Sequence, residues 1–388
     1  NGRNQRDKQG WRHLRDRDVR NEERKKQSQQ ANDTRNRRYL RLMQAKRNSQ
    51  RRRNWNSMDE VEAESSVAVD VSWKVVETFE FHKFEKLSKL PPKEEDLCWC
   101  GHLEYYEETY DRVQSKRPTP LKIIEDREFY YESTLNDPVI EELAESSGGK
   151  VFATDAILAS IMCAARSQLS WDIVATKIGG LLFLDKRDDS SFDYFTVNET
   201  AWEPPNDKDV DNVNSKSRLS LEATTINQNF TQQILNGKVK EFDMPNPFHD
   251  AEESEGKAAS VGYRYRKFNL GDTPVVCRTE LHGIAMRKGA EQYMTAFALN
   301  EYDPKLSETT PWRGALDTGA GGIMANELKN NAYKIGKWTA SSILAGADQM
   351  KVGFVSRKST RDPYKHEVLG TKYYQPAKFA QQINLSVR

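Results

Sequence analysis

The first 55 residues limit what this chain can fold into more than any other stretch, because they cannot supply a hydrophobic core. They contain 19 Lys and Arg residues against 6 Asp and Glu residues, a net charge of +13. Segments of this composition stay extended, or become helical only when they bind a partner. Residues 1–55 are therefore predicted to form a basic, largely extended or helical N-terminal arm. The arm either docks on RNA or a ribonucleoprotein, with an affinity that depends on salt, or is a solvated linker.

The rest of the chain has the opposite charge and is long enough for one large domain. The 388 residues together have a net charge of +1, so the residues after 55 carry −12. Residues 56–70 are acidic and are predicted to be a linker, which places the folded domain at residues 71–388. Four dispersed cysteines indicate free thiols in a reducing compartment. No run of about 18 apolar residues occurs, so no membrane span and no membrane partner are expected.

Alternating and helical patterns both occur in the folded domain. Alternation predicts strands at residues 72–76, 78–81, 181–184, 261–268, 273–282 and 351–355. Helices are predicted to begin at Thr154–Asp155, with Thr154 as N-cap, and to span residues 219–235 and 335–345, the last ending at Gly346. In the strand at 261–268 the tyrosines are expected to pack inward, while Arg264 and Arg266 face outward and meet phosphate.

A further strand is predicted at residues 323–329, where Glu327 and Lys329 would point to the same side. The pair is either a solvated edge ion pair, worth about 0–1 kcal/mol, or a site for phosphate or metal. The nearby glycines Gly319, Gly321 and Gly322 are interpreted as a turn, because no Gly-Lys-Ser/Thr sequence follows to make a phosphate loop.

Two other groups of residues have the right chemistry for a site. Cys98, Cys100 and His102 are placed on one face of a strand, which is either a zinc site lacking its fourth ligand or a packed strand. The helix at 219–235 has an apolar stripe and, on another face, an uncharged strip of hydrogen-bonding residues: Thr224, Asn227, Gln228 and Thr231. That strip either faces water or reads a base edge or a ribose. Asp155 lies in a first helical turn, where the helix dipole by itself stabilises its carboxylate by about 0.3–1 kcal/mol.

Eight blocks of the sequence resemble the d subunit of the eukaryotic translation initiation factor 3 complex. They are FATDAILA at 152–159, SWDIV at 170–174, FLDKRD at 183–188, VNET at 197–200, YRYR at 263–266, ELKNN at 327–331, LAG at 344–346 and QINLSV at 382–387. The resemblance covers roughly residues 70–388, and the basic region before residue 56 agrees in character.

This resemblance implies a cap-binding domain with an α+β fold similar to that of the DXO-type decapping exonucleases, in which mixed sheets pack together and are flanked by helices. It attributes binding of the mRNA 5′ cap to Asp155, to a loop matched by Gln168 and Leu169, and to a helix face matched by Thr224, Asn227 and Gln228. The chain departs from the family here, because the loop pair is commonly Val-Tyr and the last helix residue is commonly His. The missing Tyr removes a side chain that would stack on the cap or contact phosphate.

The comparison with the nucleases implies binding without hydrolysis, so that the protein is not an enzyme. The positions that match the nuclease residues for metal and scissile phosphate are Asp172, Thr231, Glu280, His282, Glu327 and Lys329. Thr231 and His282 replace carboxylates, the hard oxygen ligands that Mg²⁺ prefers, and Asp172 replaces a cation. Only Glu280, Glu327 and Lys329 keep the required chemistry. The alternatives are a residual metal-dependent cap hydrolase and a scaffold that binds only proteins.

The resemblance also implies a place of action and partners. A protein of this family works in the cytoplasm, with the capped mRNA, the other subunits of initiation factor 3 and the small (40S) ribosomal subunit as partners. The insertion at about residues 201–217 matches a segment that the family uses as a gate over the RNA path. No cofactor and no metal are implied.

Overall fold

A computed structural model of the protein describes residues 65–78, 94–250, 252, 254, 256–307 and 309–385. The predictions for the basic arm, for most of the acidic linker and for residues 79–81 lie outside the described residues. The predicted strand at 72–76 is wrong, because residues 70–73 form a turn in which Trp73 N donates to Asp70 O at 3.0 Å. The Asp70 carboxylate accepts from Ser72 N and Oγ at 2.7 and 2.6 Å, which closes this turn.

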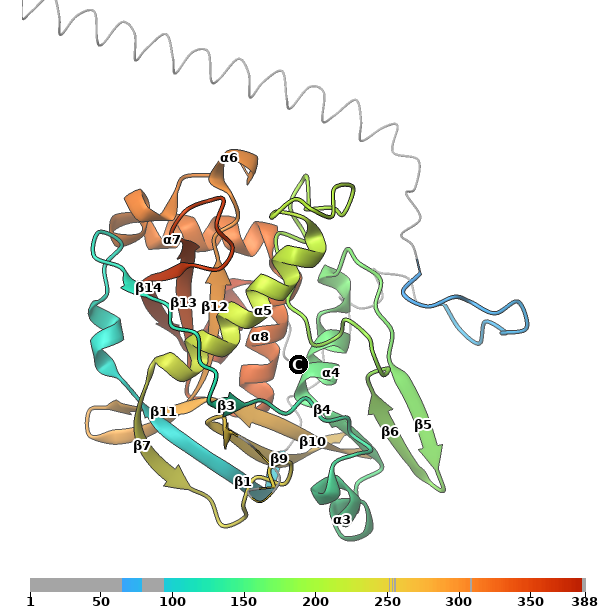
Figure 1. Ribbon diagram of the computed structural model, residues 1–388. Helices are drawn as coiled ribbons and strands as arrows, with labels where there is room; N and C mark the ends of the chain where they lie inside the picture. Colours follow the sequence, from blue (N-terminus) through green and yellow to red (C-terminus); the bar gives the residue numbers. More distant parts are fainter. Residues whose placement is uncertain are drawn as a thin grey trace, which may run out of the picture. The chain divides into compact units, whose positions relative to one another are not determined.

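Among the described residues, twelve strands form one mixed sheet with helices on its faces (Figure 1). One half runs in the order β1 (Glu94–Tyr106), β9 (Val261–Leu270), β10 (Thr273–Leu281), β4 (Val151–Thr154), β6 (Leu181–Asp185) and β5 (Val174–Ile178), and β7 (Leu235–Glu241) also pairs with β1. The other half runs in the order β11 (Gly283–Arg287), β12 (Ala290–Asn300), β13 (Gln349–Arg357), β14 (His366–Tyr374) and β2 (Thr119–Pro120). The halves join where β1 pairs with β11 in parallel.

The predicted α+β fold with mixed strands and flanking helices is confirmed. The strands expected at 181–184, 261–268, 273–282 and 351–355 correspond to β6, β9, β10 and β13. A separate pair is formed by β3 (Arg127–Glu128) and β8 (Lys257–Ala258). The helical elements are η1 (Glu108–Arg112), α3 (Pro138–Ser146), α4 (Asp155–Met162), η2 (Ala164–Arg166), α5 (Lys216–Gln233), α6 (Pro304–Ser307), α7 (Trp312–Asn330), α8 (Ala332–Leu344) and α9 (Pro376–Gln382). No helix in the described part of the chain is long and apolar enough to cross a membrane.

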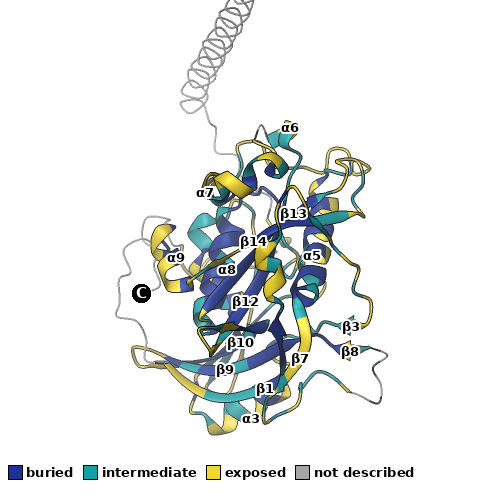
Figure 2. Cartoon of the chain, turned by 90° about the vertical axis from the view of Figure 1, so that its left-hand side faces the viewer, coloured by how far each residue is buried: buried dark blue, intermediate teal, exposed yellow. Residues whose placement is uncertain are grey.

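The alternation of side chains along β12 explains why helices cover both faces of this half of the sheet. Ala296 and Ala298 pack with Phe230 of α5, whereas Phe297 and Leu299 pack with α7 and α8 on the opposite face. Successive residues of a strand point to opposite faces, so a run of apolar residues requires cover on both. Figure 2 shows the resulting buried surfaces of α5, β12 and α8 in dark blue. The uncharged strip of α5 lies at the side of the helix that faces α4 and α8.

Residues 323–329 are part of α7 and are not a strand, so the predicted alignment of Glu327 with Lys329 is wrong. Ile323, Met324 and Glu327 are buried, a helical spacing, and Lys329 is exposed. Residues two apart on a helix do not share a face. Gly319, Gly321 and Gly322 also lie within α7 and do not form a turn, although Gly319 has non-helical dihedral angles that kink the helix. Besides its alternation, this stretch contains the i, i+1, i+4 pattern of Ile323, Met324 and Glu327, which matches one helical face.

The arginines of β9 do not face outward to phosphate, as their alternation with tyrosines predicted. Tyr263 and Tyr265 are buried as expected, but Arg266 is also buried, with ion pairs to Glu94 at 2.6 Å and Asp96 at 3.0 Å. Arg264 pairs with Asp96 and donates to the carbonyl of Ala345 at the end of α8. Both guanidinium groups are therefore paired with carboxylates of the protein itself.

The helix predicted at residues 335–345 is α8, and it ends before Gly346 as expected. Gly346 has φ +64°, and a Cβ there would lie 2.5 Å from Arg264 Nη1. Only glycine fits this left-handed conformation beside the guanidinium group without strain.

Gly353 of β13 is predicted to tolerate no side chain. A Cβ at this position would lie 2.3 Å from two atoms of the Phe230 ring, which belongs to α5 and is fully buried. We expect Gly353→Ala to lower the free energy of unfolding by about 1–3 kcal/mol, measured by urea denaturation, because overpacking displaces α5. Gly314→Ala in α7 is the control, since nothing lies within 4 Å of its Cβ and alanine favours the helix by about 0.5–1 kcal/mol. Equal stability of the two variants would contradict this account of the packing.

Candidate functional site

A pocket with a volume of about 170 Å³ lies between α4, α5, α8, β10 and β12, next to the segment at residues 128–132. Polar side chains from all of these elements line it: Thr154, Asp155, Thr224, Asn227, Gln228, Thr231, Gln232, Arg278, Glu280, His282, Thr295, Lys337 and Ser341. This arrangement brings together residues separated by more than 180 positions in the sequence. It joins both halves of the sheet, because β10 belongs to one half and β12 to the other.

Two carboxyl groups, those of Asp155 and Glu280, lie side by side in the pocket. Thr154 caps α4 and also pairs with Arg278 in the parallel β4–β10 ladder, which places Asp155 beside Glu280. Asp155 Oδ2 accepts the backbone N–H of Glu280 at 3.4 Å. Burial, together with the Glu280 carboxylate, raises the pKa of Asp155 to about 8, and burial also raises the pKa of Glu280. At neutral pH Asp155 is therefore mostly protonated, and the two groups titrate as a pair.

His282 and Thr231, two further predicted residues, line the pocket but are engaged with the backbone. His282 Nδ1 accepts the N–H of Ala296 at 2.9 Å, and burial lowers the pKa of this imidazole to about 4. Thr231 Oγ1 donates to the carbonyl of Gln228 at 2.9 Å. Both side chains are thus neutral at physiological pH, and neither adds an anionic oxygen to the pocket.

The polar strip of α5 faces the pocket, so the alternative in which it faces water does not hold. Thr224 Oγ1 accepts the N–H of Phe195 at 3.0 Å, and Asn227 Oδ1 accepts the N–H of Ala298 at 3.0 Å. Gln228 Nε2 donates to the Tyr131 hydroxyl at 2.9 Å. These bonds fix the strip against the neighbouring elements and leave the Asn227 Nδ2 group available to a ligand.

Three buried N–H donors in the pocket wall have no acceptor among the described residues. They are Gln232 Nε2, Arg278 Nε and Trp338 Nε1, on side chains that are at most 8% exposed. A buried donor without a partner costs about 1–3 kcal/mol, so these groups destabilise the wall. The three atoms are fully buried and therefore do not face a ligand in the pocket directly. Lys337 adds an ammonium group, which lies over the rings of Phe192 and Tyr333 at 5.7 and 4.7 Å from their centroids.

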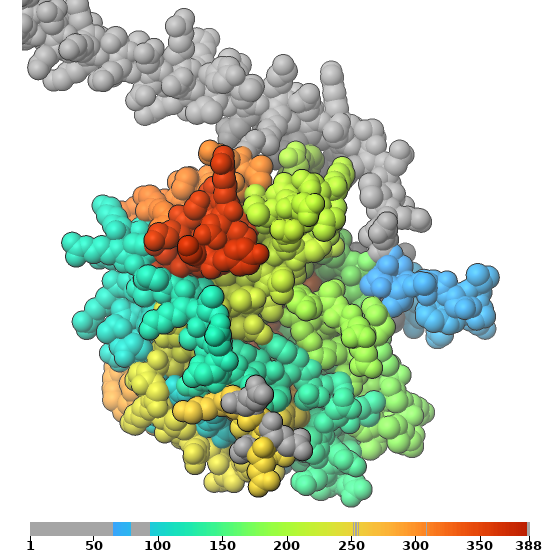
Figure 3. Space-filling view, in the orientation of Figure 1, coloured from blue at the N-terminus to red at the C-terminus, as the bar shows by residue number. Residues whose placement is uncertain are grey.

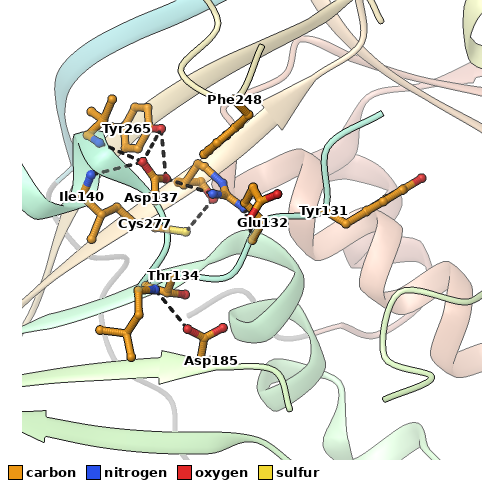
Figure 4. A network of polar contacts seen from close by, with 12 residues as sticks. Tyr131, Glu132, Thr134, Asp137, Ile140, Asp185, Phe248, Tyr265 and Cys277 are labelled. Carbon is orange, nitrogen blue, oxygen red and sulfur yellow. Dashed lines mark hydrogen bonds and ion pairs between the residues drawn. The ribbon is translucent and has the colours of Figure 1, made fainter. Parts of the chain in front are cut away.

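The segment after β3 forms one wall of the pocket and is fixed by a buried ion pair (Figure 4). Arg278 Nη1 binds Asp137 Oδ2 at 2.9 Å, and Arg278 Nη2 donates to the carbonyl of Glu132 at 2.7 Å. Asp137 also caps α3 and accepts from the Tyr265 hydroxyl at 3.0–3.1 Å. Upstream, the chain crosses α5, where Ile124 N donates to Asn229 Oδ1, and Figure 3 shows this segment at the surface in front of α5.

The structure does not bring the remaining predicted residues to this pocket. Gln168 and Leu169 lie in a loop that is held by the Glu199 carboxylate, which accepts from Gln168 N at 3.1 Å and from Ser167 Oγ at 3.2 Å. Asp172 pairs with Arg187 at 3.1 Å. Glu327 is buried beside Asn331, and burial raises its pKa to about 7, while Lys329 is exposed. None of these five residues lines the pocket.

Several lining residues were not predicted from the sequence. Tyr131, Arg278, Lys337, Trp338 and Thr295 all line the pocket, yet no local pattern distinguishes them from core or surface residues. The only available signal for Thr295 is that it lies on the same strand as Phe297, two positions away, so both point to the same face of β12.

The described residues contain no group of three or more His, Cys, Asp or Glu side chains that could hold a metal ion. The alternative of a zinc site at Cys98, Cys100 and His102 therefore has no support, and Cys100 is buried with its Sγ 3.9 Å from Met244 Sδ. In the pocket, Asp155 and Glu280 are adjacent, whereas the Asp185 carboxylate accepts from Leu135 N and Asp193 pairs with Lys186. Mg²⁺ takes six ligands in octahedral geometry.

Known proteins show what this chain is similar to. The family model described as "Eukaryotic translation initiation factor 3 subunit 7 (eIF-3)" matches residues 1–388. The Aedes aegypti protein named as the D subunit of eukaryotic translation initiation factor 3 is 50% identical over 332 residues, which are 84% of this chain and 53% of that protein. The protein of the same name from Bombyx mori is 49% identical over 331 residues, 84% of this chain and 60% of that protein. The chain thus spans just over half the length of these relatives.

Similarity to solved structures is more distant. The crystal structure of Scheffersomyces stipitis Rai1 in complex with (3′-NADP)+ and calcium ion has a TM-score of 0.46 and 9% sequence identity, and the match covers 76% of this chain and 78% of that one. The Candida albicans Rai1 structure in complex with pU5-Mn²⁺ has a TM-score of 0.43 and 12% identity, covering 78% of each chain.

Proposed function

We propose that this chain, which belongs to the family of eukaryotic translation initiation factor 3 subunit 7, acts in translation initiation by binding the 5′ cap of mRNA. Its relatives are named as the D subunit of the same factor. The observation that carries this proposal is the pocket in which the Asp155–Glu280 pair lies opposite the polar strip of α5. The relatives indicate the process, translation initiation, and the chemistry of the pocket supports the mRNA cap as the ligand.

The pocket complements the edge of a guanine base. Guanine presents two N–H donors and one carbonyl acceptor on its pairing edge, and a carboxylate accepts from both donors at once. In the Asp155–Glu280 pair, Asp155 supplies this carboxylate in its ionised form. The Asn227 Nδ2 group, for which the described residues offer no acceptor, and the Lys337 ammonium group both line the pocket and are suited to the ribose and phosphate oxygens of the cap.

We propose that the cap is bound without hydrolysis. Metal-assisted attack on a phosphate requires several anionic oxygens around the cation, or a metal-bound water. Here Thr231 and His282 are neutral and bonded to the backbone, and Asp172, Glu327 and Lys329 lie elsewhere. Burial raises the pKa values of Asp155 and Glu280, so a bound cation would have to displace a proton from them, and Asp193 is already paired with Lys186.

The gate-like insertion at about residues 201–217 remains part of this proposal. Its end is held to α5, because Arg357 donates to Asn214 Oδ1 at 2.7 Å and to Val213 O at 2.9 Å while it pairs with Glu222. Glu222 belongs to α5, so the end of the insertion is anchored to the helix that carries the polar strip. Displacement of the residues before Val213 would then control access of RNA.

Docking on the other subunits of initiation factor 3 and on the 40S ribosomal particle, in the cytoplasm, is assigned to the basic arm. Removal of residues 1–55 removes a net charge of +13. We expect the truncated protein to bind ribosomes or the factor 3 complex more weakly and with a flatter salt dependence, because fewer counterions are released. Sedimentation with 40S particles across a salt series measures both quantities. Unchanged binding and salt response would show that the arm is a linker.

The test of the function is ultraviolet crosslinking of the full chain to RNA with a labelled cap, with and without excess cap analogue and Mg²⁺. A crosslink that the analogue displaces, and that Asn227→Ala weakens, supports a cap-binding protein. Release of the cap nucleotide in Mg²⁺ would instead indicate a hydrolase. A crosslink that the analogue does not displace would overturn the proposal and favour a scaffold that binds only proteins.

A further inference from the structure

Tyr131 is an aromatic residue that lines the pocket and is nevertheless 45% exposed. The other large aromatic rings around the pocket are mostly covered by neighbours. Phe297 stacks on Trp338 with centroids 4.8 Å apart and planes 7° apart, and Tyr263 meets Phe248 edge-on at 5.1 Å. Tyr131 has no such contact with another aromatic ring in the described part of the chain, and Lys186 Nζ lies over its ring, 5.9 Å from the centroid. The exposed part of the ring is the part that a ligand in the pocket could contact.

Hydrogen bonds hold both the side chain and the backbone of Tyr131. Its hydroxyl accepts from Gln228 Nε2 at 2.9 Å, and its carbonyl accepts from Lys186 Nζ. The next residues are fixed as well, because Arg278 holds the Glu132 carbonyl and Thr134 Oγ1 donates to Leu184 O at 2.7 Å. In Figure 4 the Tyr131 ring extends away from the Arg278–Asp137 ion pair. Its exposure therefore reflects a firmly held ring and not a loose surface side chain.

We propose that Tyr131 stacks on the purine ring of the bound cap and determines the preference for 7-methylated guanine. This inference rests on the proposed function. A ring held at the opening of a pocket stacks on a planar base, and methylation at N7 places a positive charge on the purine, which an aromatic face attracts. Leu169, a residue predicted to belong to the cap site, has no aromatic ring and does not line the pocket. Tyr131 provides the stacking surface from a different element of the fold.

The bond from Gln228 connects Tyr131 to the polar strip of α5. The glutamine side chain reaches the Tyr131 hydroxyl, so the ring is tied to the helix that carries Thr224 and Asn227. Residues 131 and 228 therefore act as a unit, with Gln228 as the positioning residue.

The test is the affinity of the full chain for 7-methyl-GTP and for GTP, measured by quenching of tryptophan fluorescence. We expect Tyr131→Ala to weaken binding of 7-methyl-GTP by about tenfold and binding of GTP by less, because stacking on one base contributes about 1–3 kcal/mol. Tyr131→Phe keeps the ring and should recover most of the affinity. The matched control is Tyr373→Ala, because Tyr373 is 46% exposed, accepts from Arg287 Nη2 at 2.9 Å and lies outside the pocket.

The outcomes separate this inference from the function on which it rests. Wild-type protein that binds 7-methyl-GTP, with a Tyr131→Ala variant of equal affinity and equal methyl preference, would overturn the role of Tyr131 and leave cap binding intact. Wild-type protein that does not distinguish 7-methyl-GTP from GTP would overturn both. An equal loss in Tyr131→Ala and Tyr373→Ala would also contradict the inference, because it would point to a general effect of removing a surface tyrosine.

Discussion

Asp155→Asn is expected to weaken binding of 7-methyl-GTP by about 10- to 100-fold, because a hydrogen bond to a charged group contributes about 1.5–3 kcal/mol. The asparagine keeps the size of the side chain but replaces one acceptor oxygen with an N–H₂ group that faces the guanine donors. The matched control is Asp172→Asn, which removes a carboxylate that pairs with Arg187 outside the pocket. Equal affinities of the two variants would show that Asp155 does not contact the base.

The raised pKa of Asp155 predicts opposite effects of pH on binding and on stability. Only the ionised carboxylate accepts from guanine, so below its pKa of about 8 the affinity should rise with pH, by at most about tenfold per unit. The folded protein, however, binds this proton more tightly than the unfolded chain, in which an Asp has a pKa of about 3.9. Stability should therefore fall by a few kcal/mol as the pH rises from about 4 to 8.

Asp155→Asn should remove both trends at once, which distinguishes Asp155 from other titrating groups. Binding by fluorescence and unfolding in urea, each measured from pH 5.5 to 7.5, provide the comparison. Glu280, Arg278 and Cys277 all lie close to Asp155, and Glu280→Gln should lower the pKa of Asp155 by removing the neighbouring negative charge. A variant protein that kept the wild-type pH dependence of binding would assign that dependence to another group.

The parts of the site that the sequence predicts are those set by one helix. The positions of Thr224, Asn227, Gln228 and Thr231 follow from 3.6 residues per turn, so their common face holds wherever α5 packs. Asp155 is equally local, because Thr154 marks the start of α4 through its side-chain cap on Ile157 N. All five side chains named here as site residues line the pocket.

The parts that the sequence does not predict depend on which distant elements meet. Glu280 lies beside Asp155 because β4 and β10 pair in parallel, and no local pattern indicates that pairing. Tyr131 reaches the pocket because the buried Arg278–Asp137 ion pair fixes a segment without regular structure. Alternation over residues 323–329 predicts a strand with Glu327 on it, but Ile323, Met324 and Glu327 also match one helix face. Only packing against the rest of the fold decides between the two patterns.

Breaking the Arg278–Asp137 ion pair is expected to cost about 3–5 kcal/mol of the free energy of unfolding, out of the 5–15 kcal/mol typical of a domain. Both side chains are at most 3% exposed. Arg278→Met leaves the Asp137 carboxylate without a counter-charge, although the N–H groups of Val139 and Ile140 and the Tyr265 hydroxyl still bond to it. Because the wall that carries Tyr131 is attached through Arg278, binding of 7-methyl-GTP should weaken as well.

Two further variants decide whether the charge or the packing of Arg278 accounts for the loss of stability in Arg278→Met. Arg187→Met breaks an ion pair with Asp172 in which the arginine side chain is 41% exposed, and exposed pairs contribute only about 0–1 kcal/mol. The double variant Arg278→Met with Asp137→Leu removes both buried charges, so it should be more stable in urea than Arg278→Met alone. If it were less stable, the hydrogen bonds of Asp137 to α3 and Tyr265 would outweigh the cost of its unpaired charge. The segment would then be held mainly by those bonds, and Tyr131 should keep its place in the Arg278→Met protein.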